Sequence, residues 1–369
     1  MYSNYLINSR FNQNQLGHKD RIAKYDNIKG LAIFLVVLVH VMSPARENGV
    51  DIYINLTNFL CIFAMPLLFF VGGYFSKIRE DSSIKAFKNI FIPYIVFTAI
   101  WIVFNYYVLG NPLQKYPFVV PVYGLWFLAS LFLMRLILPI LVKIKHILLI
   151  AIITALLIGV LPLANDFFAY SRTFCFLPIF LVGYYYNDYK RELIGKISKY
   201  GSIVNLLKNK TFIFIIIVLS ITLIGIFSIS IGSFESSFDI LQLGSSYVKT
   251  NLSIPEGIIL RFIIIISGII GALLVNKLMT NKVTFLTKLG INSFTIYILH
   301  LYIVRFIFVK LRQDSPLEFI FNDPLLNGVY TVIMVSLISY TLSRDYVTKI
   351  FNKFINIFTN AIMRPENQD

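Results

Sequence analysis

The sequence predicts an all-α fold, a polytopic bundle of about ten transmembrane helices with both termini in the cytoplasm. Of its 369 residues, 57% are apolar and only 14% are charged, whereas soluble domains are nearer one half and one quarter. The apolar residues gather in runs long enough to cross a bilayer, and Lys and Arg lie mainly on one side of those runs. Intrinsic disorder is excluded because it requires low hydrophobicity.

Each predicted span is a run of about 20 apolar residues, the length that crosses the hydrocarbon layer as a helix. In chain order the spans cover residues 28–46, 54–75, 90–110, 122–141, 146–163, 172–187, 211–232, 256–277, 291–311 and 326–344. The sixth run is short, and the first carries a histidine. No cleavable signal peptide is expected, because the polar start of the chain has no early apolar core.

The spans divide the chain into a cytoplasmic tail (1–27), a membrane domain (28–344) and a cytoplasmic C-terminal segment (345–369). In the last segment, apolar residues at helical spacing alternate with Lys349 and Lys353. This pattern predicts an amphipathic helix that lies on the membrane.

The basic residues set the predicted orientation. Of the 33, 24 lie on the side of the N-terminus and five on the other side. This asymmetry is typical of a multi-pass plasma-membrane protein with both ends inside. It also argues against nucleic-acid binding as the reason for the net charge of +15, because the charges form no continuous patch. The remaining four, Arg135, Arg172, Arg261 and Arg305, fall within or at the ends of spans.

The loops are short, so any chemistry must lie within or just above the bundle. Cys61 and Cys175 lie inside apolar runs, which argues against a disulfide framework or a cysteine-based zinc site. We expect no metal site and no bound cofactor. Internal repeats and a Gly-rich phosphate loop are not evident.

Three polar residues share one stripe of the first span. Lys29 and His40 are 11 residues apart, which is three helical turns plus about 20° and about 16 Å along the axis. Asp26 is one turn before Lys29 and shares its face. Ionisable groups within a span are candidate functional residues. The alternatives are a structural hydrogen-bonded His40 and a Lys29 that reaches the membrane interface as an anchor.

Five further residues are candidates for substrate binding. His300 lies near the middle of the ninth span and Arg305 follows it; Arg261 follows Glu256 in the eighth span, and a structural ion pair is the alternative for these charges. Trp126 opens the fourth span, where a plain aromatic-belt anchor is the alternative.

Lys85 and Lys88 lie three residues apart in the first cytoplasmic loop and would project together on a helix. The bias of basic residues toward the cytoplasm explains them without a function. A site for a phosphorylated cytoplasmic ligand is the alternative, because basic clusters bind phosphate.

At these residues the chain resembles the integral-membrane acyltransferase family 3, which includes polysaccharide O-acetylases and fucose-O-acetylase-like proteins. The matching motifs span positions 25 to about 310. They are Tyr25-Asp26-Asn27-Ile28-Lys29-Gly30-Leu31 leading to His40, Phe69-Phe70-Val71-Gly72-Gly73-Tyr74, Lys85-x-x-Lys88 before Ile92-Pro93-Tyr94, Tyr123-Gly124-Leu125-Trp126-Phe127-Leu128, and Leu289-Gly290-x-Asn292-Ser293 leading to Tyr297-x-x-His300. Lys29, Lys85 and Lys88 stand where the family more often has Arg, so the bidentate guanidinium contact is lost at these positions.

The resemblance implies transfer of an acyl group, usually acetyl from acetyl-CoA as co-substrate, to a hydroxyl of a carbohydrate. It implies His40 as the general base, with an acyl-histidine intermediate less favoured. Lys29, Lys85 and Lys88 would hold the CoA phosphates and Asp26 would orient Lys29. His300 and Arg305 would position the acceptor or stabilise the oxyanion.

The main alternative to an enzyme is a transporter of a glycan or small solute, with the polar stripe lining its pathway. Transport favours inverted repeats and broken helices in paired positions, which the sequence does not display. The acceptor glycan, the acyl group and the oligomeric state are not specified by the sequence. The bias toward Ile, Lys, Asn, Phe and Tyr indicates an AT-rich bacterial genome.

Overall fold

The computed structural model describes residues 23–162, 167–197, 210–232, 237–313 and 316–363. Most of these residues are helical, and no strand occurs in those ranges. The α-helices are Ala23–Glu47 (α2), Asp51–Tyr74 (α3), Ser82–Ala86 (α4), Ile92–Val103 (α5), Trp126–Leu141 (α6), Ile147–Leu157 (α7), Tyr170–Ile197 (α8), Lys210–Gly232 (α10), Ser237–Leu241 (α11), Ile254–Leu278 (α12), Phe285–Ile291 (α13), Ser293–Gln313 (α14), Pro324–Leu342 (α15) and Asp345–Ile362 (α16). Short 3₁₀ turns cover Tyr123–Leu125 (η4), Ile158–Val160 (η5), Phe167–Ala169 (η6), Val248–Thr250 (η7) and Pro316–Phe321 (η8).

Each predicted span has an apolar helix in the structure. Within the described ranges, eight helices are long and apolar enough to cross a membrane, and the shorter Ile147–Val160 and Val218–Gly232 correspond to the fifth and seventh predicted spans. The sixth span, predicted from a short run at 172–187, is longer and covers Phe167–Asp188. The all-α polytopic fold is therefore confirmed, while the side of the membrane that each terminus occupies stays a prediction.

The first helix begins earlier than the first predicted span. It starts at Ala23 rather than at residue 28, so Asp26 lies in its first turn, where a carboxylate interacts favourably with the helix dipole. The polar residues at the start of the motif are thus helical and belong to the bundle. Asp26 and Asn27 are both buried.

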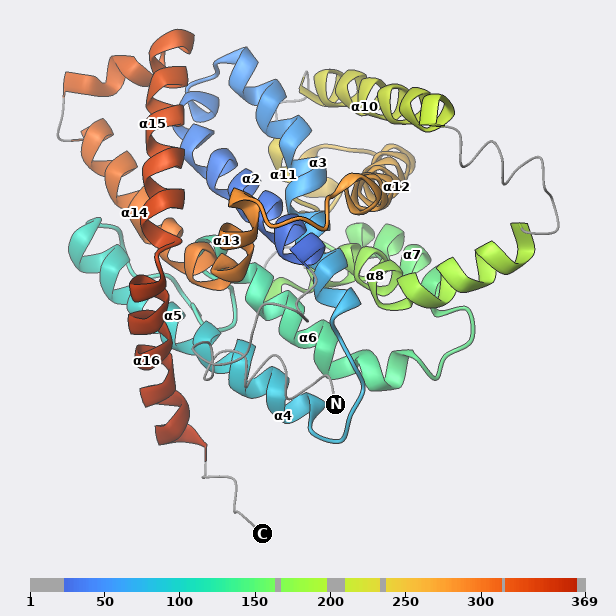
Figure 1. Cartoon of the computed structure of the whole chain (residues 1–369). Helices are drawn as coiled ribbons and strands as arrows, with labels where there is room; N and C mark the ends of the chain where they lie inside the picture. The colour runs from blue at the N-terminus through green and yellow to red at the C-terminus, as the bar shows by residue number, and fades with distance from the viewer. Residues whose placement is uncertain (1–22, 163–166, 198–209, 233–236, 314–315, 364–369) are drawn as a thin grey trace.

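Helix α2 lies near the centre of the bundle (Figure 1). It packs against α3 on one side and against α13, α14 and α15 on the other. Helices α7, α8 and α12 pack together beyond α3. Helices α4, α5 and α6 form the lower part of Figure 1, whereas α10 lies at its upper right edge. The candidate residues of α2 are therefore surrounded by helices that are distant in the sequence.

Two close helix contacts depend on reciprocal pairs of glycines. Between α2 and α13, Gly30 lies against the backbone of Leu286 and Gly290 lies against the backbone of Asp26. Between α3 and α8, Gly73 and Gly183 each lie against the backbone of the other helix in the same way. A Cβ at any of these four positions would overlap a main-chain carbonyl. Small residues permit such close approach of membrane helices.

Two buried asparagines join segments of the chain. The Asn27 amide donates to the carbonyl oxygens of Thr280 and Lys282, and its oxygen accepts from the hydroxyls of Thr284 and Thr287. All of its hydrogen-bonding groups are therefore used in holding the turn between α12 and α13 against α2.

Asn292 has a similar role at the C-terminal end. Its amide donates to the carbonyl oxygen of Ser343 at 2.9 Å, and its oxygen accepts from the hydroxyl of Thr348 at 2.8 Å. Both asparagines belong to motifs of the family resemblance, and in the structure both act as connections between helices.

The span around α5 contains two π-helical turns. Phe87–Phe91 (η2) joins α4 to α5, and Phe104–Val108 (η3) follows α5. Together these segments form one continuous helix from Ser82 to Val108. Such π-turns occur frequently beside functional sites, and η2 carries Lys88.

The predicted amphipathic segment forms α16, which descends from the bundle at the lower left of Figure 1. Phe351 is buried, and its ring stacks on Phe97 of α5 at 5.3 Å. Tyr346, Ile350 and Ile357 remain exposed. One apolar side thus packs on the bundle, and the other is the side predicted to contact lipid.

Candidate functional site

Two histidines from different helices meet in the half of the bundle that is predicted to face outward. The ring centroids of His40 on α2 and His300 on α14 are 5.1 Å apart, and the rings are inclined by 71°. His300 is fully buried, whereas His40 is partly exposed. Both were candidates from the sequence, but their contact depends on the register between α2 and α14, which helical periodicity within one span does not specify.

Both imidazoles use the same local hydrogen bond. Nδ1 of His40 lies 2.9 Å from the carbonyl oxygen of Val36, and Nδ1 of His300 lies 2.9 Å from that of Ile296. A carbonyl oxygen only accepts, so in each neutral ring Nδ1 carries the hydrogen and Nε2 keeps its lone pair. Nε2 of His300 is buried and has no hydrogen-bond partner among the described residues. The two histidines therefore each present a basic nitrogen.

Tyr123 forms an aromatic wall beside His40. Its ring centroid is 5.5 Å from that of His40, and its other side stacks on Trp101 at 5.0 Å with only 11° between the planes. The guanidinium of Arg305 lies 5.9 Å from the same ring. Tyr123 itself adopts a φ of 42° at the start of η4, which is a costly backbone conformation for a bulky residue. The predicted residues Arg305 and His40 therefore lie beside the same Tyr123 ring.

Tyr297 supports the second histidine. Its hydroxyl donates to the carbonyl oxygen of Gly124, and its ring is 6.0 Å from that of His300. Sequence reasoning included Tyr123 and Tyr297 in motifs but not among the site residues. The spacing of three residues from Tyr297 to His300 was a usable signal, because it places both side chains on one face of α14. For Tyr123, no signal within its own segment indicated a contact with α2.

Trp126 is buried in an aromatic cluster, with its ring near those of Phe69 and Phe176 at 6.2 and 5.8 Å. Only 8% of its surface is exposed, so it is not a lipid-facing anchor of the aromatic belt. The guanidinium of Arg172 lies 4.6 Å from the Trp126 ring and donates to Oε1 of Gln242 at 2.7 Å. Trp126 therefore lines the interior of the bundle.

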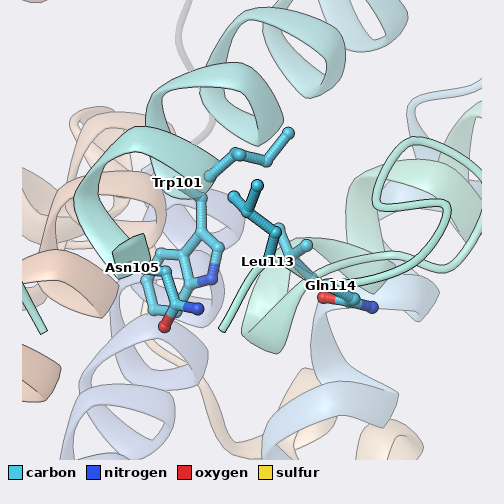
Figure 2. A pocket seen from close by; sticks show the side chains of 6 residues that line it. Trp101, Asn105, Leu113 and Gln114 are labelled. Carbon is cyan, nitrogen blue, oxygen red and sulfur yellow. The ribbon is translucent and has the colours of Figure 1, made fainter. Parts of the chain in front are cut away.

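Trp101 lines a small pocket (Figure 2). Its ring stacks on Tyr123, which in turn contacts His40, so two aromatic rings connect the pocket to the candidate base. The other lining residues are Ile102, Asn105, Leu113, Gln114 and Val122. Figure 2 shows Asn105 and Gln114 among them, so polar side chains are present at this opening beside the candidate site.

Glu256 and Arg261 have separate partners rather than pairing with each other. Glu256 is exposed and completes the capping box of α12, accepting from the backbone N–H and the hydroxyl of Ser253 at 2.9 and 2.6 Å. Arg261 is buried and donates to the carbonyl oxygens of Ser245 and Ala155 at 2.8 and 3.3 Å. Of the two sequence interpretations, a direct Glu256–Arg261 ion pair is therefore wrong.

Arg261 also lies 4.8 Å from the ring of Tyr247. The hydroxyl of Tyr247 donates to the carbonyl oxygen of Leu156, and burial raises the pKa of this phenol. These contacts hold the segment after α11 against α7 and α12. The structure does not bring Glu256 or Arg261 into the group around His40, and their part in substrate binding stays a prediction.

The opposite end of α2 carries the predicted ion pair. Nζ of Lys29 lies 2.7 Å from Oδ1 of Asp26, whose side chain is 5% exposed. The Lys29 ammonium is also 6.0 Å from the ring of Phe75. The ring of Tyr25 stacks on that of Tyr74 at 4.0 Å and also contacts Phe75. The shared face of Asp26 and Lys29 is thus confirmed.

Lys85 and Lys88 lie on the continuous helix that starts at Ser82. Lys85 is in α4 and forms an ion pair with Asp81, and Lys88 is in the π-turn η2. The sequence interpretation treated both as residues of a regular helix. The π-turn instead separates their registers, because it contains more residues per turn than an α-helix.

The described residues contain no group of three or more His, Cys, Asp or Glu side chains that could hold a metal ion. Their arrangement does provide two chemical capacities. A pair of neutral imidazoles in an aromatic setting can accept protons at one end of α2. Ammonium groups at the other end can bind an anion.

Comparison with known proteins identifies one matching family. A family model described as an acyltransferase domain, that of acyltransferase family 3, matches residues 22–344. No curated protein and no solved structure matches the chain.

Proposed function

The chain belongs to the acyltransferase family 3 of membrane proteins, and from this premise we propose that it moves an acyl group, acetyl in the simplest case, from cytoplasmic acyl-CoA to a hydroxyl of a carbohydrate. Family membership and the apolar helices make it a membrane acyltransferase. The proposal adds the donor, the acceptor and the base. The acceptor would be a cell-surface or lipid-linked glycan, and the membrane would be a bacterial plasma membrane.

One observation carries the proposed role of His40. Its Nδ1 is bound to the carbonyl oxygen of Val36, which leaves Nε2 as the basic atom of the neutral ring. A sugar hydroxyl is a weak nucleophile, and a positioned imidazole can take its proton during the attack. His40 is partly exposed, so a substrate hydroxyl can reach its ring from one side.

The proposed reaction has one transfer step. The acceptor hydroxyl oxygen attacks the thioester carbonyl carbon while Nε2 of His40 takes the hydroxyl proton. The new C–O bond forms, the C–S bond breaks, and the CoA sulfur takes the proton from the imidazolium. The products are the acylated carbohydrate and CoA with a free thiol. Attack by Nε2 itself, forming an acyl-histidine, is the less favoured route.

The ionic end of α2 is proposed to bind the donor. Lys29 is held in place by Asp26 at 2.7 Å, and Lys85 and Lys88 lie in the segment that precedes α5. These ammonium groups would bind the CoA phosphates on the cytoplasmic side. Lys29 and His40 are about 16 Å apart along the helix axis, so the acyl-pantetheine arm would extend through the bundle between them.

The acceptor would be positioned from the other side of the His40 ring. His300 presents Nε2 as an acceptor, which suits a hydrogen bond from a sugar hydroxyl better than stabilisation of an oxyanion. Arg305 is a cation near Tyr123, so it is better suited to stabilise the negative charge that develops on the thioester oxygen. Trp126 would line the acceptor path, and Glu256 and Arg261 are proposed acceptor contacts at the outer end of α12.

The test is acyl transfer by purified protein in inside-out proteoliposomes, with isotope-labelled acetyl-CoA outside. Mass spectrometry of cell-surface glycans with and without the gene identifies the acceptor. We expect the labelled acyl mass on a glycan, and its loss when the gene is deleted. Failure of the protein to bind acetyl-CoA at millimolar concentration, with a glycan or solute crossing the membrane instead, would support the transporter alternative.

A further inference from the structure

Arg135 is a charged residue inside a span. It shares a face of α6 with Leu128, Leu131 and Leu138, which are all buried, whereas the lipid-facing side carries the exposed Leu136. This face of α6 therefore turns toward the interior of the bundle, and the Arg135 side chain is partly buried there. Its Nε is shielded from solvent and has no hydrogen-bond partner in the described part of the chain. A charge in such a place usually belongs to a functional site.

Contacts between α3 and α6 show what lies at the level of Arg135. Leu131 packs directly on Gly72, and α3 and α6 run parallel because one span lies between them. One turn further toward the cytoplasmic end, Arg135 on α6 comes level with Phe75 on α3. Lys29 lies over the ring of Phe75 at 6.0 Å. Arg135 and Lys29 therefore lie at the same depth of the bundle.

A second contact places Lys88 at this depth as well. The rings of Phe132 on α6 and Phe91 on η2 are 4.7 Å apart, and these two helices run antiparallel. One turn nearer the cytoplasmic end than this ring contact, α6 carries Arg135 and η2 carries Lys88. Packing of α6 against both α4 and η2 is consistent with this register.

Carboxylates neutralise only part of this charge. Asp26 pairs with Lys29, and Asp81 pairs with Lys85. In the ranges that the structure describes, neither Lys88 nor Arg135 forms an ion pair with a carboxylate. Like charges gathered inside a bundle without counter-ions are costly. The arrangement thus favours a bound anion at this level.

We propose that Arg135 binds a phosphate group of the CoA donor, together with Lys29 and Lys88, from within the bundle. The inference rests on the proposed function and adds to it a residue that faces the donor from α6. It also supplies a chemical group that the lysines lack, because a guanidinium offers two parallel N–H donors to one phosphate. The same chemistry would suit the phosphate of an anionic lipid headgroup.

The experiment measures CoA affinity in a neutral detergent by isothermal calorimetry for the wild type, Arg135→Gln and Arg135→Lys. Lys143→Gln is the matched control, because it removes one positive charge from an exposed position just beyond α6. We expect Arg135→Gln to weaken CoA binding by about ten- to a hundredfold, the loss expected for a charge-assisted hydrogen bond. The CoA affinity of Arg135→Lys should lie between those of the wild type and Arg135→Gln. The CoA affinity of Lys143→Gln should equal that of the wild type.

A second ligand separates phosphate binding from damage to the fold. For S-acetylpantetheine, which has no phosphate, Arg135→Gln and wild type should bind equally. If Arg135→Gln binds CoA as well as wild type does, the inference is wrong and the proposed function stands. An equal loss for both ligands would mean that Arg135 only maintains the fold. If the wild type does not bind CoA, the proposed function itself fails.

Titration with phosphatidylglycerol distinguishes the two sources of phosphate. We expect this lipid not to compete with CoA for the wild-type protein. If it displaces CoA from the wild type but not from Arg135→Gln, the phosphate bound by Arg135 is that of a lipid headgroup, and the donor assignment is overturned.

Discussion

The two ends of α2 hold polar groups of different chemical character. At one end His40 faces His300 and Tyr123, with ring distances of 5.1 and 5.5 Å, and both imidazoles are bonded only to backbone carbonyls of their own helices in the described contacts. At the other end Lys29 pairs with Asp26 at 2.7 Å. One helix thus carries an imidazole at one end and an ion-paired ammonium group at the other, at a fixed separation.

Under the proposed function, the two ends of α2 would serve the two different substrates. A buried aromatic setting favours a neutral imidazole with its Nε2 lone pair available, since burial disfavours a charged ring. An ion pair near a basic segment instead favours retention of a phosphorylated ligand. The comparison predicts that substitutions at the first end change the rate of the chemical step, whereas those at the second end change the affinity for the donor.

His40→Ala should have the largest effect. We expect the transfer rate to fall by about 10²- to 10⁴-fold, the usual contribution of a general base, with the affinity for acyl-CoA unchanged. Initial rates with labelled acetyl-CoA measure this, and calorimetry reports donor binding. His146→Ala is the control, because that histidine is exposed at the start of α7. Full activity of His40→Ala would remove this residue from the mechanism.

His300→Gln should have the next largest effect. Glutamine keeps a hydrogen-bonding group but places it differently, so we expect the KM for the acceptor to rise by about tenfold, near 1.4 kcal/mol. The KM for acyl-CoA should stay the same. Steady-state kinetics with each substrate varied in turn gives both values. A change confined to the donor KM would contradict the assignment of His300 to the acceptor side.

Lys29→Ala should act mainly on the donor. Losing one of several cations is expected to raise the KM for acyl-CoA by about three- to tenfold, because each charge-assisted contact contributes about 1 kcal/mol at a partly exposed site. The matched control is Lys277→Ala, an exposed lysine in the last turn of α12. If Lys29→Ala lowers kcat and leaves the donor KM unaltered, the separation of roles along α2 fails.

Asn27→Ala should have the smallest effect on activity, although Asn27 is adjacent to the proposed site residue Asp26. Its amide is fully used in holding the turn after α12, so its loss should lower the stability by about 1–3 kcal/mol. The expected donor KM is that of the wild type. Thermal unfolding in detergent together with donor kinetics checks both expectations, and a large rise in the donor KM would place Asn27 in the binding site.

Periodicity within each helix predicted much of the fold and one part of the site. The apolar runs predicted the helices because a span requires a continuous apolar surface. The shared face of Asp26 and Lys29 followed from 3.6 residues per turn. The meeting of His40 with His300 did not follow, since it depends on how two helices separated by more than 200 residues pack together.

Other features depend on packing for the same reason. Trp126 begins a span, which favoured a belt anchor, yet the arrangement of Phe69 and Phe176 places it inside the bundle. Separate partners for Glu256 and Arg261 arise from a capping box and from loop carbonyls, which sequence spacing alone does not distinguish from an ion pair.

The reciprocal glycine contacts have a consequence for how the sequence can change over evolution. At each of the two contacts both partners must remain without a side chain, because a Cβ on either helix would meet a carbonyl of the other. A larger residue on one helix cannot be accommodated by a smaller one opposite, since the obstructing atom is a main-chain carbonyl oxygen that every residue carries. In a saturation mutagenesis scan, Gly30, Gly73, Gly183 and Gly290 should therefore tolerate fewer replacements than most residues of the site itself.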